Sequence, residues 1–185
     1  MGLRNTSQEF GSLAKWLHWL IALGLVVILY MGLEQSGMER GPEKSEMRVI
    51  HGSIALVVFV LMTVRLAWRL MNEVPAHPDG MPAVQRAIAT LVHWAIYIAV
   101  FVQLISGPIT IATGGRPIPF FGLFSFSLPV EASEEAHHFW EEVHEFSWRI
   151  VAAIVVLHIL GALYNHFIAK NDVLRRMTTG AKQDG

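Results

Sequence analysis

Four long apolar segments separated by polar stretches dominate the pattern of this chain, roughly over residues 16–33, 49–70, 88–112 and 147–168. Each is long enough to cross the hydrocarbon core of a bilayer, which takes about 20 mostly apolar helical residues. Helices are expected because backbone polar groups inside lipid have no water to bond. The pattern therefore predicts an all-α integral membrane protein, a four-helix bundle over residues 1–177 followed by a polar tail at 178–185.

The composition supports a membrane protein. The 185 residues are 53% hydrophobic and 16% charged, which is too apolar for an ordinary soluble domain. The absence of cysteine excludes Cys-ligated iron–sulfur clusters, thiolate zinc sites and covalently attached c-type haem. The first segment has no small-residue cleavage site and continues into a charged loop at Glu34, so we do not interpret it as a signal peptide. No basic cluster of the kind that binds nucleic acid is visible.

The charged residues are unevenly distributed although the formal net charge is only -1. Most of the Lys and Arg residues lie in the N-terminal segment, in the 71–87 loop and in the C-terminal tail, with the flanking helix ends. The opposite side holds most of the acids, from Glu34 to Glu145. Because cytoplasmic loops carry an excess of Lys and Arg, both termini are predicted to lie in the cytoplasm.

Histidines occur within every apolar segment or at its end. His144 and His158 are close to four helical turns apart, so both leave the same helix face with about 21 Å between them. His51 opens the second segment and His144 opens the fourth, which places both near the outer membrane face. His18 lies about 22 Å below the outer end of the first segment. The four histidines thus sort into an outer pair, His51 with His144, and an inner pair, His18 with His158.

Two facing imidazoles are suitable axial ligands for haem iron held non-covalently in a helical bundle. Zinc fits less well because it takes three or four protein ligands, and copper remains an option from imidazole alone. A single histidine at a helix end is better explained by a bond to a backbone carbonyl, but four that pair by depth favour a cofactor. Glycines on four helices either provide room for it or serve close helix packing: Gly24, Gly52, Gly107 and Gly161.

Arginines accompany both levels. Arg65 lies on the same helix face as His51 and about 21 Å deeper, at the level of the inner pair. A buried guanidinium needs an anion or a strong acceptor, so we interpret Arg65 as a partner of a haem propionate or a quinone carbonyl. The alternative is that it reaches the cytoplasmic interface, which we prefer for Arg69. Arg48, one turn before His51, and Arg149 are placed to bind outer propionates.

Four segments taken together resemble the bacterial cytochrome b561 family, small four-helix di-haem proteins related to the b-type cytochrome subunit of nickel–iron hydrogenases. They are "KWLHWL", "RVIHGSIALVVFVLMTVRLAWR", "LVHWAIYIAVFVQLISGPI" and "WEEVHEFSWRIVAAIVVLHILGALYNHF". The resemblance implies two non-covalent b haems with bis-histidine ligation and electron transfer between a periplasmic or membrane donor and the quinone pool. The family's ligands map onto His18, His51, His144 and His158. Some members are thought to oxidise superoxide and reduce ubiquinone, while relatives serve hydrogenases or other dehydrogenases.

Two further histidines lie closer to the cytoplasm than the inner pair, His93 at about 28 Å and His166 at about 33 Å from the outer face. A histidine at a wet interface is a suitable proton donor to a quinone. We therefore interpret both, together with Arg65, as candidate quinone contacts, with Asn165 and Gln103 as weaker candidates. The alternative is a pair of interfacial histidines without a role.

The longest connection runs from Thr113 to Val143. Its first half is rich in Gly, Pro and Phe, which predicts broken structure with phenylalanines at the membrane interface. Its second half is predicted to extend the fourth helix outward. There His137 shares a face with His144, and we expect a solvated surface histidine rather than a competing ligand. The residues after Arg175 are expected to be disordered.

The sequence thus predicts a di-haem b-type cytochrome of the bacterial inner membrane that carries electrons between a periplasmic-side donor, with superoxide as one candidate, and the quinone pool. Its partners would be lipid, quinone, an electron donor, and either a second copy or a redox partner subunit. The acids of the outer loop favour cationic donors over anions such as superoxide, and whether the protein is an enzyme depends on the donor. Two alternatives remain: a cytochrome b anchor subunit of a hydrogenase or dehydrogenase complex, and a metal or proton transporter that binds no haem.

Overall fold

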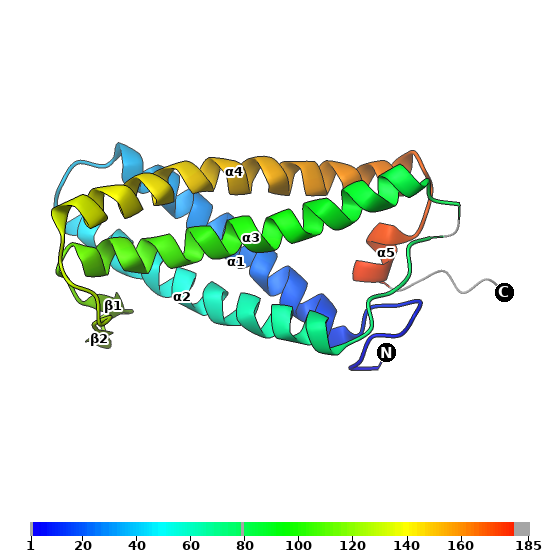
Figure 1. Ribbon diagram of the computed structural model, residues 1–185, viewed down its shortest axis with the longest axis horizontal. Coiled ribbons are helices and arrows are strands. Elements are labelled where there is room, and N and C mark those ends of the chain that lie inside the picture. Colours follow the sequence, from blue (N-terminus) through cyan, green and yellow to red (C-terminus); the bar gives the residue numbers. More distant parts are fainter. Residues whose placement is uncertain (1, 79, 180–185) are drawn as a thin grey trace.

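The structure, a computed structural model, describes residues 2–78 and 80–179. Within these residues the chain forms, in order, α1 (Ser12–Gly37), α2 (Pro42–Met71), α3 (Ala83–Thr113), β1 (Ile118–Phe120), β2 (Phe124–Phe126), α4 (Glu134–Phe167) and α5 (Val173–Met177). The four long helices run along the length of the molecule, with the small hairpin at one end and α5 near the other (Figure 1).

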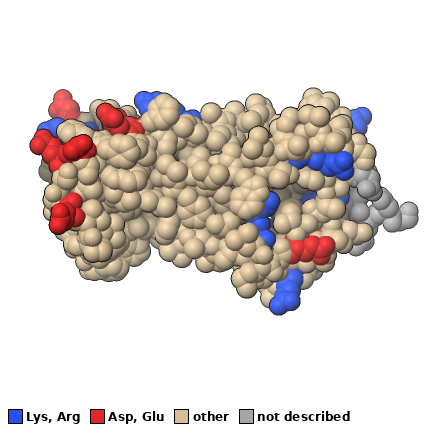
Figure 2. Space-filling view, viewed as in Figure 1, with Lys and Arg blue, Asp and Glu red and all other residues tan. Residues whose placement is uncertain are grey.

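Each of α1 to α4 is long and apolar enough to cross a membrane, with a mean hydropathy of 2.0 or 2.1 over its most apolar window. Large apolar side chains point away from the bundle; Leu23 is 63% exposed and Ile98 is 65% exposed. An apolar exterior of this extent is stable against lipid rather than water. Figure 2 shows a surface that is mostly uncharged along the molecule, with most of the visible acids at one end. The prediction of a mostly helical protein with four candidate membrane spans is confirmed.

The helices extend beyond the apolar segments that predict them. α4 begins at Glu134 in the outer connection, where the Oγ of Ser133 caps it by accepting from the amide of Ala136 at 3.3 Å. Glu134 and Glu135 occupy its first turn, where the helix dipole favours acids. α2 likewise starts at Pro42, a residue suited to the first helical position. Hydropathy therefore identifies the lipid-crossing part of each helix, and capping residues decide where the helix begins.

The bundle is built from two helix pairs. α1 packs mainly on α2 and α3 mainly on α4, and contacts between α2 and α3 join the pairs. The buried core between them includes Ile21, Val58, Val100 and Val151. A Cβ added to Gly24 would come within 2.5 Å of the Val58 Cγ2 atom. This glycine therefore serves close packing of α1 on α2, one of the two roles that the sequence suggested.

The outer connection contains a short antiparallel hairpin that the sequence analysis did not predict. At its turn, Phe121 and Gly122 have φ values of 49° and 71°, in the left-handed region that is unusual for a bulky residue. The amide of Phe121 donates to the Oγ of Ser53 at 2.7 Å, and Ile118 is fully buried. Contacts with α2 thus hold this turn in place, while Leu123 at its tip is exposed.

Chain segments from both ends of the sequence meet at the opposite end of the bundle (Figure 1). The indole of Trp19 donates to the carbonyl of Met177 at 2.9 Å, and the guanidinium of Arg176 donates to the carbonyl of Ala76 at 2.6 Å. The expectation of disorder directly after Arg175 is therefore wrong for Arg176 and Met177, which form the end of α5 and bond to other segments. Thr178 also bonds back to the carbonyl of Leu174 at 3.2 Å, and residues 180–185 of the predicted tail lie outside the described residues.

The lipid-facing position of α4 can be tested with single cysteines, because the chain has none of its own. Leu157 lies on the exposed apolar side of α4, and in liposomes we expect Leu157→Cys to resist a membrane-impermeant maleimide. The reason is that a thiol in hydrocarbon does not ionise and the reagent does not enter the bilayer. Glu131→Cys in the outer connection should react readily. Both should react in unfolded protein, and equal rates in the liposomes would contradict the membrane placement of α4.

Candidate functional site

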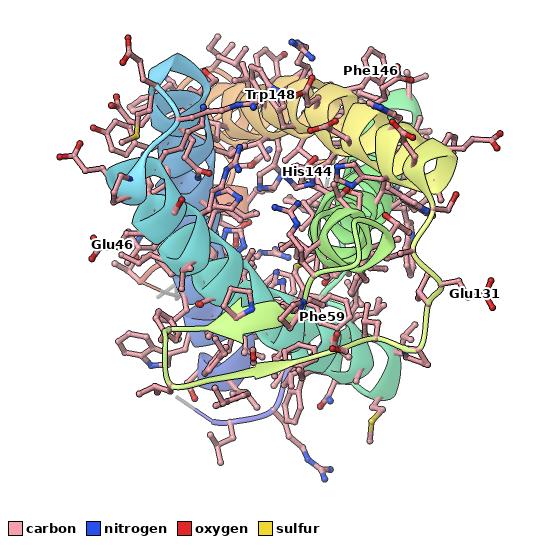
Figure 3. All side chains as sticks on the ribbon, turned by 90° about the vertical axis from the view of Figure 1, so that its left-hand side faces the viewer. Glu46, Phe59, Glu131, His144, Phe146 and Trp148 are labelled. Carbon is pink, nitrogen blue, oxygen red and sulfur yellow. The ribbon has the colours of Figure 1, made fainter. Side chains whose placement is uncertain are left out.

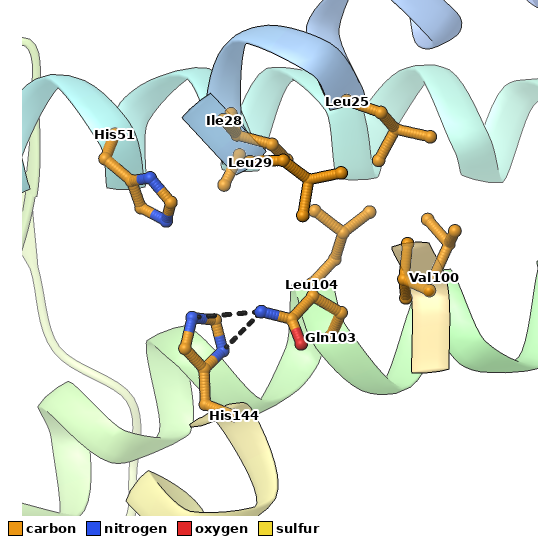
Figure 4. Close-up of a pocket in the computed structure, with 10 residues that line it drawn as sticks. Leu25, Ile28, Leu29, His51, Val100, Gln103, Leu104 and His144 are labelled. Atoms are coloured by element: carbon orange, nitrogen blue, oxygen red, sulfur yellow. Dashed lines mark hydrogen bonds between the residues drawn. The ribbon is translucent and has the colours of Figure 1, made fainter. Parts of the chain in front are cut away.

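Two histidines from α2 and α4 face each other toward the end of the bundle that carries the hairpin. The ring centres of His51 and His144 are 6.4 Å apart and their planes meet at 84°. Figure 3 shows His144 pointing into the bundle, whereas Glu46 and Glu131 point outward. Figure 4 shows the cavity between the two rings, which apolar side chains of all four long helices complete: Leu25, Ile28, Leu29, Ala55, Val100, Leu104 and Val151.

The two rings of this outer pair differ in their hydrogen bonds. The Oγ of Ser106 lies 2.9 Å from Nδ1 of His144. The amide nitrogen of Gln103 lies 3.1 Å from Nε2 of the same ring and 3.2 Å from Nδ1. The hydroxyl of Ser147 donates to Oε1 of Gln103. In the described part of the chain, the buried Nδ1 of His51 has no hydrogen-bond partner. An unpaired buried polar atom costs about 1–3 kcal/mol, so His51 is suited to a ligand that bonds its ring.

Three histidines gather further along the bundle. The ring centres of His18, on α1, and His158, on α4, are 6.1 Å apart with planes at 74°. His93, on α3, lies with its ring centre 5.2 Å from that of His158. The structure therefore places His93 beside the inner pair, nearer to it than the depth estimate from the sequence suggested.

Ring separations distinguish histidines that could share a metal from histidines that merely touch. With metal–nitrogen bonds of about 2 Å and about 1.1 Å from each nitrogen to its ring centre, two imidazoles in line on one metal have centres about 6.2 Å apart. The outer pair at 6.4 Å and the inner pair at 6.1 Å both match this value. The 5.2 Å between His93 and His158 is too short. His18, rather than His93, is the geometric partner of His158.

Each pair offers two ligands and no more. Across residues 2–78 and 80–179, no group of three or more His, Cys, Asp or Glu side chains is arranged to hold a metal ion. A metal at either pair would need its other coordination positions filled by a cofactor, as the macrocycle of a haem fills them. A Cβ added to Gly107 would lie 3.2 Å from Cε1 of His144, so this glycine leaves room for that ring.

Arg65 lies next to the inner pair, as its spacing from His51 suggested. Its guanidinium donates to the carbonyl of Ala14 at 2.7 Å, one helical turn before His18. A small pocket there is lined by Asn5, Phe10, Ala14, Arg65, Trp68, Arg69, Val74 and Tyr97. The buried indole nitrogen of Trp68 has no hydrogen-bond partner among the described residues. The guanidinium of Arg69, which the sequence analysis predicted at the interface, lies over the rings of Trp94 and Tyr97.

Three of the predicted site residues make no contact with either histidine pair in the described part of the chain. Arg48 is exposed at the start of α2. Arg149 is exposed too, and its guanidinium donates to the carbonyl of Glu145 within α4. His166 contacts the ring of its neighbour Phe167 in the last turn of α4.

Three other residues have partners that the sequence did not suggest. His137 donates from Nδ1 to the carbonyl of Thr110 at 2.8 Å, so it ties α4 to the end of α3 and is not a solvated histidine. Gln103, a weaker quinone candidate, belongs to the outer site through its contact with His144. Asn165, the other weaker candidate, accepts hydrogen bonds from Gln85 and Asn171 at the opposite end of the bundle.

Several site residues were missed in the sequence. Ser106, Ser147 and the indole of Trp68 were not singled out, because serine and tryptophan are common in membrane helices. One signal existed: Ser106 follows Gln103 by three positions and Ser147 follows His144 by three, so each pair shares a helix face.

Comparisons with known proteins identify relatives that match most of the chain. Two proteins of Escherichia coli strain K12 are similar over almost their whole length. Cytochrome b561 homolog 2 is 27% identical over 100% of this chain and 98% of that protein, and cytochrome b561 homolog 1 is 30% identical over 92% and 97%. A probable superoxide oxidase CybB of Yersinia pestis is 26% identical over 92% of this chain and 96% of that protein.

The family match confirms the resemblance found in the sequence. Residues 9–180 match the family described as prokaryotic cytochrome b561, a range that includes all four long helices and every histidine of the two pairs. The chain therefore belongs to the prokaryotic cytochrome b561 family.

Proposed function

We propose that this protein is a di-haem b-type cytochrome that transfers electrons across the membrane between a donor at its outer end and quinone at its inner end. Membership of the family implies b-type haem. His51 with His144 would hold one haem iron, and His18 with His158 would hold the other. One observation carries the proposal: two histidine pairs, at different levels of the bundle, each have the ring separation that one shared metal requires.

The surroundings of the outer pair fit a flat, largely apolar cofactor. The lining beyond the two histidines is mostly apolar, and Nδ1 of His51 has no hydrogen-bond partner within the described residues. When bound, haem supplies a reversible one-electron centre, while the protein supplies its ligands, its orientation and a water-poor environment. Because both histidines of each pair would serve as ligands, neither site leaves an axial position for a substrate, which favours electron transfer over chemistry at the iron.

The pocket beside the inner pair supports an acceptor site at that end. Arg65 and Trp68 both line it, and each is a hydrogen-bond donor. Two such donors suit a quinone carbonyl or a haem propionate. His93, whose ring touches that of His158, and His166 at the end of α4 remain our further candidates for contact with the quinone.

The charge at the outer end bears on the donor. Acidic side chains gather there (Figure 2), and a negative field attracts cations and repels anions. Superoxide, to which the name of the Yersinia relative points, is an anion and would approach against this field. Arg48 could offset the field locally and bind an outer propionate or an anion. We therefore rank a cationic donor ahead of superoxide.

We further propose that the protein lies in the bacterial inner membrane with both termini in the cytoplasm. The basic residues of the terminal segments and of the 71–87 loop support this orientation. In intact cells, Glu131→Cys should react with an impermeant maleimide, because it would face the periplasm, whereas Arg86→Cys at the other end of α3 should react only after the inner membrane is opened. The reverse pattern would place the termini outside.

The ligand assignment predicts haem content. Wild-type protein should contain two b haems per chain by the pyridine haemochrome assay, and His51→Ala and His18→Ala should each contain one, because a haem with one ligand removed is released. The matched control is His93→Ala, which removes a ring from the same inner cluster and should keep both haems. Unchanged haem content in His51→Ala and His18→Ala, or no b haem in the wild type, would refute the proposal.

The acceptor site predicts a role for Arg65. In prereduced protein, Arg65→Gln should slow re-oxidation of the haems by a short-chain ubiquinone about tenfold or more, since a hydrogen bond to a charged group contributes about 1.5–3 kcal/mol. The control is Arg86→Gln, which removes an exposed positive charge at the same end and should leave the rate unchanged. Equal rates in both variants would exclude Arg65 from the quinone site, and a shifted inner-haem potential would assign it to a propionate.

A further inference from the structure

A closed set of polar contacts surrounds His144 and involves residues that the proposed function does not use. Gln103 and Ser106 come from α3, and Ser147 comes from α4 one turn after the histidine. Ser106 is 0% exposed and Ser147 is nearly buried as well. Because hydroxyls buried in a membrane bundle must use their hydrogens within the protein, the direction of each hydrogen bond can be worked out.

Ser106 fixes the proton on His144. Its Oγ lies 3.0 Å from the backbone carbonyl of Gln103 and 2.9 Å from Nδ1 of His144. The carbonyl has no hydrogen, so the single hydroxyl hydrogen of Ser106 must be donated to it. The contact with His144 then requires that Nδ1 carries a hydrogen and donates it to Ser106. In this tautomer the lone pair of Nε2 is free.

Gln103 contacts the ring from another side without selecting a tautomer. The hydroxyl of Ser147 donates to Oε1 of Gln103, which turns the amide so that its NH₂ group faces His144. This NH₂ group lies 3.1 Å from Nε2 and 3.2 Å from Nδ1, so it faces the ring edge between the two nitrogens. The contact with Ser106 therefore assigns the hydrogen to Nδ1.

The other histidine of the outer pair has no comparable support. The buried Nδ1 of His51 lacks a hydrogen-bond partner within the described residues. Ser53, two positions later on α2, is equally buried, but its hydroxyl donates to the carbonyl of Val49 and accepts from the amide of Phe121. The outer pair is thus asymmetric: a buried hydroxyl accepts from Nδ1 of His144, whereas Nδ1 of His51 has no partner within the described residues.

We propose that Ser106 is a positioning residue of the outer haem site. It holds His144 in the tautomer that presents Nε2 to iron, and it thereby lowers the reduction potential of the haem bound there. A hydrogen bond from the distal ring nitrogen makes an imidazole a more basic ligand, and a more basic ligand stabilises ferric over ferrous iron. This inference rests on the proposed function, because it requires His144 to be a haem ligand.

The test is an anaerobic redox titration of the two-haem protein in lipid nanodiscs. The titration should show two redox transitions, one for each haem. His51→Ala should keep only the inner haem, so the transition that it lacks belongs to the outer haem. In Ser106→Ala we expect the reduction potential of the outer haem to rise by about 59 mV, which corresponds to about a tenfold change in the ferrous-to-ferric ratio for one electron. The reduction potential of the inner haem should stay unchanged. The low-spin electron paramagnetic resonance signal of the outer haem should change with it.

Three variants separate the hydrogen bond from packing. Ser106→Thr keeps the hydroxyl and should restore the wild-type potential. Ser106→Cys keeps the side-chain volume but replaces the hydroxyl with a weak acceptor, so it should shift the outer potential in the same direction as Ser106→Ala. If the alanine variant does not retain haem, the cysteine variant shows whether the hydrogen bond sets the potential. Ser53→Ala removes an equally buried serine hydroxyl next to the outer site, without a histidine contact, and should leave both potentials unchanged.

The outcomes distinguish this inference from the function on which it rests. Two haems with an unshifted outer potential in Ser106→Ala and Ser106→Cys would overturn the role of Ser106 and leave the cytochrome assignment intact. An equal shift in Ser53→Ala would also overturn it, since the effect would then be one of packing. A wild-type protein without two haems would instead remove the proposed function itself.

Discussion

The spacing of two histidines on one rigid helix determines the geometry of both candidate haem sites. α4 presents His144 and His158 on one face, and the rise of an α-helix separates them by about 21 Å. Each faces a ring from a different helix, His51 from α2 and His18 from α1. α4 packs mainly on α3, and α1 mainly on α2, so few direct contacts join α4 to the α1–α2 pair. Ligation of a metal at both levels would connect these two parts of the bundle.

Lipid makes this arrangement demanding, because every polar group inside the bundle must find a partner there. The structure meets the demand mostly with local bonds. Arg65 donates to the backbone of α1, and Ser53 joins its own helix to the hairpin. Two of the exceptions are therefore informative. Nδ1 of His51 and the indole nitrogen of Trp68 are buried without partners among the described residues, and they lie at the outer site and the inner pocket, where a cofactor or quinone would supply the missing contact.

The sequence predicted those features that depend on one helix at a time. Lipid requires continuous apolar helices, so hydropathy gave the four spans, and the fixed helical rise placed His144, His158 and Arg65 correctly relative to their own helices. Features that depend on two helices were predicted less well. The depth of His93 was counted from the end of α3, and residue spacing contains no information on how α3 is offset or tilted against α4. The contact between Phe121 and Ser53 joins positions 68 residues apart, and no local pattern specifies it.

The hydrogen bonds and charges together suggest a direction for electron flow. At the outer level of the proposed di-haem cytochrome, the bond from His144 to Ser106 would favour ferric iron and so lower the reduction potential of a haem bound there. At the inner level, no such bond to His18 or His158 is present among the described residues, and the guanidinium of Arg65 lies one helical turn from His18. A nearby positive charge favours the reduced form, which carries one positive charge fewer. With a haem at each level, as proposed, both effects would make the inner haem the better electron acceptor. An electron that enters at the acidic outer end would therefore move downhill toward the pocket of Arg65 and Trp68, the direction required for reduction of quinone at that end.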